Sequence, residues 1–174
     1  MSGPLLEELA GPPRSLSLIE SGRVLGGLRW VELEAFRTLG QLAAEVKAPQ
    51  GGSELAVWAS GSSLAHAWRA EQLESLLPVS AGLTGAEECT ASPGSTVTDW
   101  VVSLVPAVCD GDIYSPGGVQ NWYTVLAGAY ELRAAHPHPS ADGAVIRSLR
   151  RLAADVRLVA REYRPLAGVG GGDT

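Results

Sequence analysis

Residues 17–46, SLIESGRVLGGLRWVELEAFRTLGQLAAEV, decide the fold. Ser17 and Glu20 have the spacing of a capping box, in which two side chains bond free backbone amides at the start of a helix. Apolar residues then recur every three or four positions, as they do on one face of a helix. We therefore predict one long helix from Ser17 to about Val46.

A single carboxylate interrupts this apolar face. At seven-residue spacing the face carries Leu18, Leu25, Glu32, Leu39 and Val46. Glu32 thus lies halfway along an apolar seam, where a carboxylate without a partner is destabilising. We expect a cation, a proton or a metal beside it.

Three more long helices are predicted further along the chain, over residues 54–77, 119–135 and 141–164. Pro78 stops the first of them because proline lacks an amide hydrogen, and Ser140 is a favourable N-cap for the last. No run of alternating β-branched residues indicates a strand. The predicted fold class is therefore all-α.

The connection between the second and third helices is roughly forty residues long, far longer than a simple turn. Thr96 and Asp99 have the spacing to cap a short extra helix within it, which we expect to end near Pro106. Four long helices with one such crossover indicate a four-helix bundle.

The chain has 174 residues, the size of one domain. We assign the helical bundle domain to residues 15–165, with an N-terminal arm over 1–14 and a disordered tail over 166–174, because both ends contain glycine- and proline-rich breaks. No signal peptide or membrane span is recognisable, so we expect a cytoplasmic protein without a membrane partner. Cys89 and Cys109 are then expected to be reduced thiols.

The charge of the chain is unevenly distributed. There are 13 basic and 19 acidic residues, and the net charge of −6 argues against a nucleic-acid partner. Residues 147–164 contain six arginines and two acidic residues, so they carry +4 and the remainder carries −10. Oppositely charged regions favour recognition of a protein surface. We expect a homo- or hetero-oligomer formed through the faces of the bundle.

The second helix offers partners for Glu32. His66 and Arg69 are three residues apart and project from the same side of that helix. If the first two helices face each other in antiparallel fashion, both side chains lie opposite Glu32. In the alternative, this side of the helix curves to the surface and leaves His66 and Arg69 partly exposed.

This arrangement over residues 17–164 resembles the ferritin-like superfamily, whose bundles also join their second and third helices by a long crossover. The resemblance rests on that architecture and on Glu32. It implies a Glu on one helix of each pair and a Glu-x-x-His motif on the other, which together bind two metals, usually iron.

The chain departs from the superfamily at the metal site itself. Ser63 stands three residues before His66, where the motif has Glu, and no Glu-x-x-His occurs in the chain. Glu131 and Asp155 are the carboxylates available on the last two helices, and Leu158 follows Asp155 where a His is expected.

Arg69 suggests how such a fold survives without the metal ligands. A guanidinium at the position of the metals neutralises Glu32 and forms a bidentate pair with it. We therefore predict a metal-free bundle with a Glu32–Arg69 polar core and no cofactor, with iron as the alternative.

Two functions of different classes remain open. The first is a non-redox accessory or regulatory subunit of a bacterial small-molecule pathway, such as secondary metabolism, since a strong preference for Arg over Lys is typical of GC-rich bacterial genomes. The second is an enzyme whose small-molecule ligand meets four candidate catalytic residues in a central pocket: Glu32, His66, Arg69 and Tyr130. There Glu32 or His66 serves as acid or base and Arg69 holds an anionic substrate. An iron-dependent oxygenase or hydroxylase is the variant that the resemblance implies.

Overall fold

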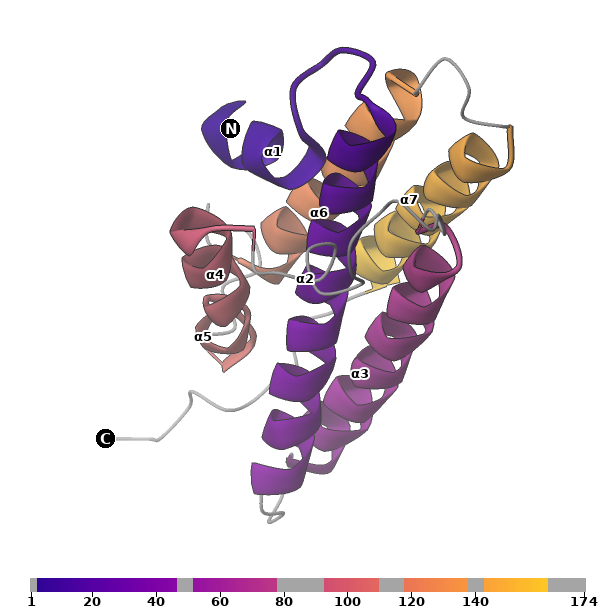
Figure 1. Ribbon diagram of the computed structural model, residues 1–174. Helices are drawn as coiled ribbons and strands as arrows, with labels where there is room; N and C mark the ends of the chain where they lie inside the picture. The colour runs from indigo at the N-terminus through magenta and orange to yellow at the C-terminus, as the bar shows by residue number, and fades with distance from the viewer. Residues whose placement is uncertain (1–2, 47–51, 78–92, 110–117, 138–142, 163–174) are drawn as a thin grey trace.

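The computed structural model describes residues 3–46, 52–77, 93–109, 118–137 and 143–162. Every regular element within these ranges is a helix, which confirms the all-α fold class (Figure 1). The helices in chain order are α1 (Gly3–Ala10), α2 (Leu18–Glu45), α3 (Gly52–Glu74), α4 (Ser95–Val102), α5 (Leu104–Cys109), α6 (Val119–Ala135) and α7 (Gly143–Glu162). None of the described helices is both long and apolar enough to cross a bilayer.

Helix α2 begins with the predicted capping box. The Ser17 hydroxyl accepts a hydrogen bond from the Glu20 amide at 3.3 Å, and the Glu20 carboxylate accepts one from the Ser17 amide at 2.7 Å. The middle of the predicted seam is buried, including Glu32, whereas Leu18 at its start is 48% exposed. The predicted position of Glu32 within an apolar seam is therefore confirmed, and the seam becomes exposed at its first residue.

The N-terminal arm is a helix, α1, and it docks on the rest of the chain. Pro4 lies in its first turn, where a proline needs no amide hydrogen. Gly11 ends it with a φ of +71°, a left-handed conformation that favours glycine. Leu9 and Ala10 are buried, and α1 contacts α2 and α6. The prolines and glycines of this arm thus lie at the ends of a helix and do not prevent it from forming.

The described part of the crossover, residues 93–109, contains two short helices, α4 and α5, rather than the one that was predicted. Pro106 is the third residue of α5, so it lies in a first turn instead of ending a helix. Gly94 caps α4 without a side-chain hydrogen bond, so the predicted cap by Thr96 is wrong. The crossover is held to α6 by the Trp100 and Trp122 rings, which stack with centroids 4.4 Å apart.

The four long helices are packed as two pairs, α2 with α3 and α6 with α7 (Figure 1). Helix α6 has the predicted bounds, whereas α3 ends at Glu74, before the predicted Leu77. The predicted N-cap and end of the last helix, Ser140 and Arg164, lie outside the described residues. Buried side chains fill the space between the pairs, among them Leu28, Leu73, Leu126 and Leu152. This layer between the pairs also contains the polar groups.

Candidate functional site: a buried Glu–Arg–His–Tyr network

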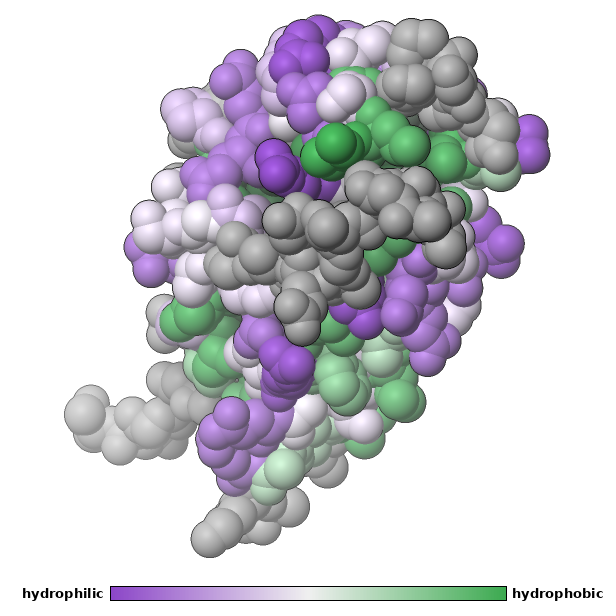
Figure 2. All heavy atoms as spheres, in the orientation of Figure 1, coloured by the Kyte–Doolittle hydropathy of each residue, from purple (hydrophilic) through white to green (hydrophobic). Residues whose placement is uncertain are grey.

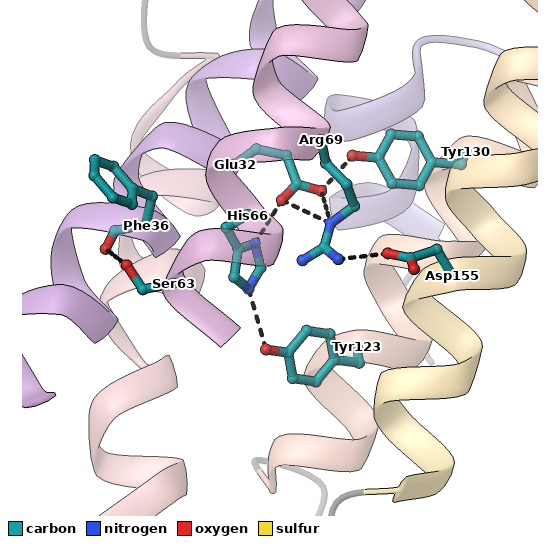
Figure 3. Close-up of polar contacts among 8 residues, drawn as sticks. All are labelled: Glu32, Phe36, Ser63, His66, Arg69, Tyr123, Tyr130 and Asp155. Carbon is teal, nitrogen blue, oxygen red and sulfur yellow. Dashed lines mark hydrogen bonds and ion pairs between the residues drawn. The ribbon is translucent and has the colours of Figure 1, made fainter. Parts of the chain in front are cut away.

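The Glu32 carboxylate is the centre of a buried polar network (Figure 3). Its side chain is 0% exposed, and it comes from the middle of α2. Arg69 Nε donates to Oε1 at 3.0 Å and to Oε2 at 3.1 Å. His66 Nδ1 donates to Oε2 at 2.5 Å, and the Tyr130 hydroxyl donates to Oε1. Both carboxylate oxygens therefore have protein donors, from α3 and α6.

Arg69 lies between two carboxylates that belong to different helix pairs. Its Nη1 donates to Asp155 Oδ2 of α7 at 2.7 Å, on the side opposite Glu32 (Figure 3). The Arg69 side chain is 0% exposed, whereas the Asp155 side chain is 36% exposed, so the network reaches solvent at Asp155. Arg69 Nη2 is buried and has no hydrogen-bond partner among the described residues.

His66 extends the network toward α6. Because a carboxylate can only accept, Nδ1 of His66 carries the hydrogen that points to Glu32. Its Nε2 then accepts from the Tyr123 hydroxyl at 3.1 Å. The imidazole stacks on the Tyr123 ring and meets the Trp122 ring edge-on. These contacts fix the ring in one orientation and one tautomer.

The electrostatics of the site favour one charged pair surrounded by neutral groups. Burial alone raises the pKa of Glu32, but attraction to Arg69 and hydrogen bonds from His66 and Tyr130 outweigh it, so that pKa lies below its usual value. Burial lowers the pKa of Arg69, and the attraction of Glu32 more than offsets this.

The remaining two groups are held in their neutral forms. Burial, assisted by the Arg69 charge, lowers the pKa of His66 below its usual value despite the attraction of Glu32. Burial and the Glu32 charge raise the pKa of Tyr130 well above its usual value. At neutral pH the network therefore consists of a carboxylate, a guanidinium, a neutral imidazole and a neutral phenol.

The structure brings all four predicted site residues together: Glu32, His66, Arg69 and Tyr130. The alternative in which His66 and Arg69 are partly exposed is wrong, because both are 0% exposed. Glu131, the other carboxylate considered on α6, lies on the surface and pairs with Arg157 at 2.7 and 2.6 Å.

Sequence reasoning did not single out Tyr123 or identify Asp155 as a partner of Arg69. A signal for Tyr123 is present, because it precedes Tyr130 by seven residues and so lies on the same face of α6. Asp155 is at the edge of the apolar stripe of α7, and nothing in the pattern of that helix indicates which cation it meets.

The donor set does not fit the two irons that the superfamily resemblance implies. The guanidinium of Arg69 lies within hydrogen-bond distance of both nearby carboxylates, so a cation already stands between Glu32 and Asp155. The one imidazole directs its protonated nitrogen at Glu32 and its lone pair at a phenol. Within the described residues no three His, Cys, Asp or Glu side chains converge as metal ligands.

Two kinds of chemistry fit this geometry. A closed network of paired charges can join the two helix pairs, and a carboxylate–imidazole–phenol chain can hold and move a proton. Comparisons with protein-family models, curated proteins and solved structures found no match to this chain.

Proposed function

We propose that this chain is a metal-free, ferritin-like four-helix bundle that acts as an accessory or regulatory subunit, in the cytoplasm, for an enzyme of bacterial small-molecule metabolism. Its central network replaces a metal site and joins the α2–α3 pair to the α6–α7 pair. Its outer helix faces bind protein.

The observation that carries this proposal is the closure of the network. Glu32, His66, Arg69 and Tyr130 are each 0% exposed. Each oxygen of the Glu32 carboxylate already accepts hydrogen bonds from protein donors, so neither is left to bind a substrate or abstract its proton. A catalytic group must come within hydrogen-bond reach of the proton it transfers, and these groups are separated from solvent by the surrounding helices. The arrangement supports a structural role for the network.

A second candidate, a metal-free acid–base enzyme, is favoured by one specific observation. Arg69 Nη2 is a buried donor without a described partner, and the neighbouring Asp155 carboxylate is partly open to solvent. An oxygen atom of a small ligand that enters beside Asp155 would satisfy Nη2. In that case His66 would be the proton-transferring group, oriented by Glu32.

Metal analysis of the purified full chain tests the first part of the proposal. We expect iron and manganese far below one equivalent per chain, because the Arg69 charge repels a cation from the only buried carboxylate of the network. Near-stoichiometric iron or manganese would contradict a metal-free bundle.

Two variants distinguish the accessory subunit from the enzyme. If the network is structural, we expect Glu32→Gln and Arg69→Ala to lose much of their stability with no change in ligand binding. If the chain is an enzyme, we expect both variants to keep the fold and to lose turnover. The accessory role itself requires that the activity of an enzyme co-purified with this chain depends on its presence, and an enzyme whose rate is unchanged after removal of the chain would refute it.

A further inference from the structure

Helix α3 exposes a stripe of acidic and apolar side chains that nothing in the described structure covers. We call it the acidic–apolar stripe, and it consists of Glu54, Val57, Gly61, Leu64 and Glu71. Val57 is 72% and Leu64 is 67% exposed, the two highest values among the large hydrophobic residues described. A side chain at Gly61 would meet no atom within 4 Å. Figure 2 shows green, hydrophobic spheres in its lower right, where α3 lies in Figure 1.

Helix α7 exposes a stripe of the opposite charge. This arginine stripe consists of Arg147, Arg150, Arg151, Ala154, Arg157, Leu158 and Arg161, all of them exposed. Arg157 pairs with Glu131, and Arg151 lies 5.8 Å from the centre of the Trp68 ring. Arg147, Arg150 and Arg161 belong to none of the ion pairs found among the described residues.

The two stripes resemble each other in pattern and overlap along part of their length. At a rise of about 1.5 Å per residue, the acidic–apolar stripe is about 26 Å long and the arginine stripe about 21 Å. The first has apolar side chains between Glu54 and Glu71, and the second has Ala154 and Leu158 between arginines. An apolar centre flanked by opposite charges is the arrangement that complementary interfaces use.

Both stripes lie on neighbouring helices of one molecule. Arg69 of α3 contacts Asp155 of α7, and Trp68 contacts Arg151. A surface that presents two complementary stripes side by side can pair with its own copy about a two-fold axis, because the same stripe-to-stripe contact then forms twice in the dimer.

We infer that this chain forms a two-fold dimer in which the acidic–apolar stripe of each copy packs on the arginine stripe of the other. The inference rests on the proposed accessory function and names a second copy of the chain as the partner of these faces. Helices α3 and α7 run in opposite directions (Figure 1), with Arg69 and Asp155 at the same level. A two-fold axis along the helices keeps those levels. At about 1.5 Å per residue, Leu64 then lies about 3 Å along the axis from Leu158 of the second copy and Glu71 about 4.5 Å from its Arg150, whereas Glu54 and Val57 lie beyond the described end of α7.

Sedimentation velocity of the full chain from about 1 µM to about 1 mM tests the inference, a range that covers weak and moderate dimers. We expect a dimer whose Kd rises with salt, because rim charges are screened. Leu64→Glu should raise that Kd at least about tenfold, as a carboxylate replaces an apolar contact. Val102→Glu is the matched control, since Val102 is 63% exposed on α4, away from both stripes, and it should leave the Kd unchanged.

A charge-swap pair gives the sharper test. Glu71→Arg and Arg150→Glu should each weaken self-association, because every homodimer then contains like charges opposite each other at two places. Mixing the two variants should restore a dimer, since one contact is reversed and the other is native. Circular dichroism confirms that each variant is folded, which is expected because all the altered side chains are exposed.

Three outcomes would overturn the inference: a wild-type chain that stays monomeric throughout the series, a dimer that survives Leu64→Glu, or no recovery in the charge-swap mixture. Binding of duplex DNA to the arginine stripe of a chain that stays monomeric would overturn the inference as well. A monomeric, metal-free chain on which an enzyme still depends would refute only this dimer and leave the accessory function standing.

Discussion

Replacing Arg69 with methionine removes the only cation of the buried network while keeping a side chain of similar length. In the native chain Arg69 is bonded to Glu32 and to Asp155, and both Arg69 and Glu32 are 0% exposed. The variant leaves the Glu32 carboxylate buried without its counter-ion. Removing one partner of a buried pair costs about 3–5 kcal/mol of stability, because an uncompensated charge stays out of water.

This loss is large compared with the stability of a typical domain, about 5–15 kcal/mol. For a chain of this length each kcal/mol lowers the melting temperature by about 2–4 °C, so the expected decrease is roughly 6–20 °C. The double variant Glu32→Gln, Arg69→Met should recover part of it, roughly 1–3 kcal/mol, because no charge is then left unpaired.

The loss caused by Arg69→Met should also depend on pH. In the wild type the pKa of Glu32 is lowered by folding, so its contribution is present above the unfolded pKa, about 4.3, and is lost as the pH falls through the folded pKa. Without Arg69, burial dominates and raises the pKa of Glu32, so the variant is least stable at neutral pH and gains a proton on acidification. The difference from wild type should be largest near pH 7 and smallest near pH 4.

Urea unfolding followed by circular dichroism, repeated across this pH range, measures these differences. Arg14→Met is the matched control, because the Arg14–Glu20 pair is 56% and 41% exposed, lies outside both stripes and contributes little to stability. If Arg69→Met costs no more than this control, or if its cost does not change with pH, Arg69 does not neutralise a buried Glu32.

Three further predictions concern single residues. Tyr130→Phe should lower the free energy of unfolding by about 1.5–3 kcal/mol in urea titrations, because it removes a donor to a buried charge, and a loss below about 0.5 kcal/mol would contradict that hydrogen bond. Folding lowers the pKa of His66, so the unfolded chain binds a proton there at a higher pH than the folded chain does. The free energy of unfolding should therefore fall below about pH 6.5, by at most about 1.4 kcal/mol per pH unit. His66→Gln should flatten this dependence between pH 5 and pH 6.5, and an unchanged slope there would count against a neutral His66. Gly11→Ala should lower the melting temperature in a thermal scan, since residue 11 has a φ of +71° and a new Cβ would lie 3.0 Å from Val24, whereas an unchanged value would show that the α1–α2 turn adapts.

The central charged and imidazole groups of the network could be predicted from helical periodicity. Glu32 is the one carboxylate at seven-residue spacing in an apolar seam, and His66 and Arg69 share one side of the next helix. The partners across the pairs were harder to find. Tyr123 lies on a buried face of α6, where an aromatic residue is equally typical of an ordinary apolar core. Asp155 is partly exposed, so neither residue stands out in the sequence of its own helix.

Local sequence signals are misleading at two prolines, because tertiary packing decides whether a proline ends a helix or lies in its first turn. Pro4 and Pro106 both occur in stretches whose composition is typical of loops, yet each lies in the first turn of a short helix. Such short helices are marginal alone, and α1 forms because Leu9 and Ala10 are buried against the rest of the chain. The sequence of one segment does not contain that information.

The network also explains how two apolar helix pairs find a single alignment. A seam of Leu25, Leu28 and Leu39 would pack almost equally well if α2 slipped along its neighbours by two turns, about 10.5 Å. Glu32 removes that freedom, because a slip would carry its carboxylate away from His66, Arg69 and Tyr130 and leave the buried carboxylate and these donors without each other. The cost of those unpaired groups is far greater than any difference in apolar contact. A buried polar network between the pairs therefore selects one register, and with it the relative position of the outer faces of α3 and α7.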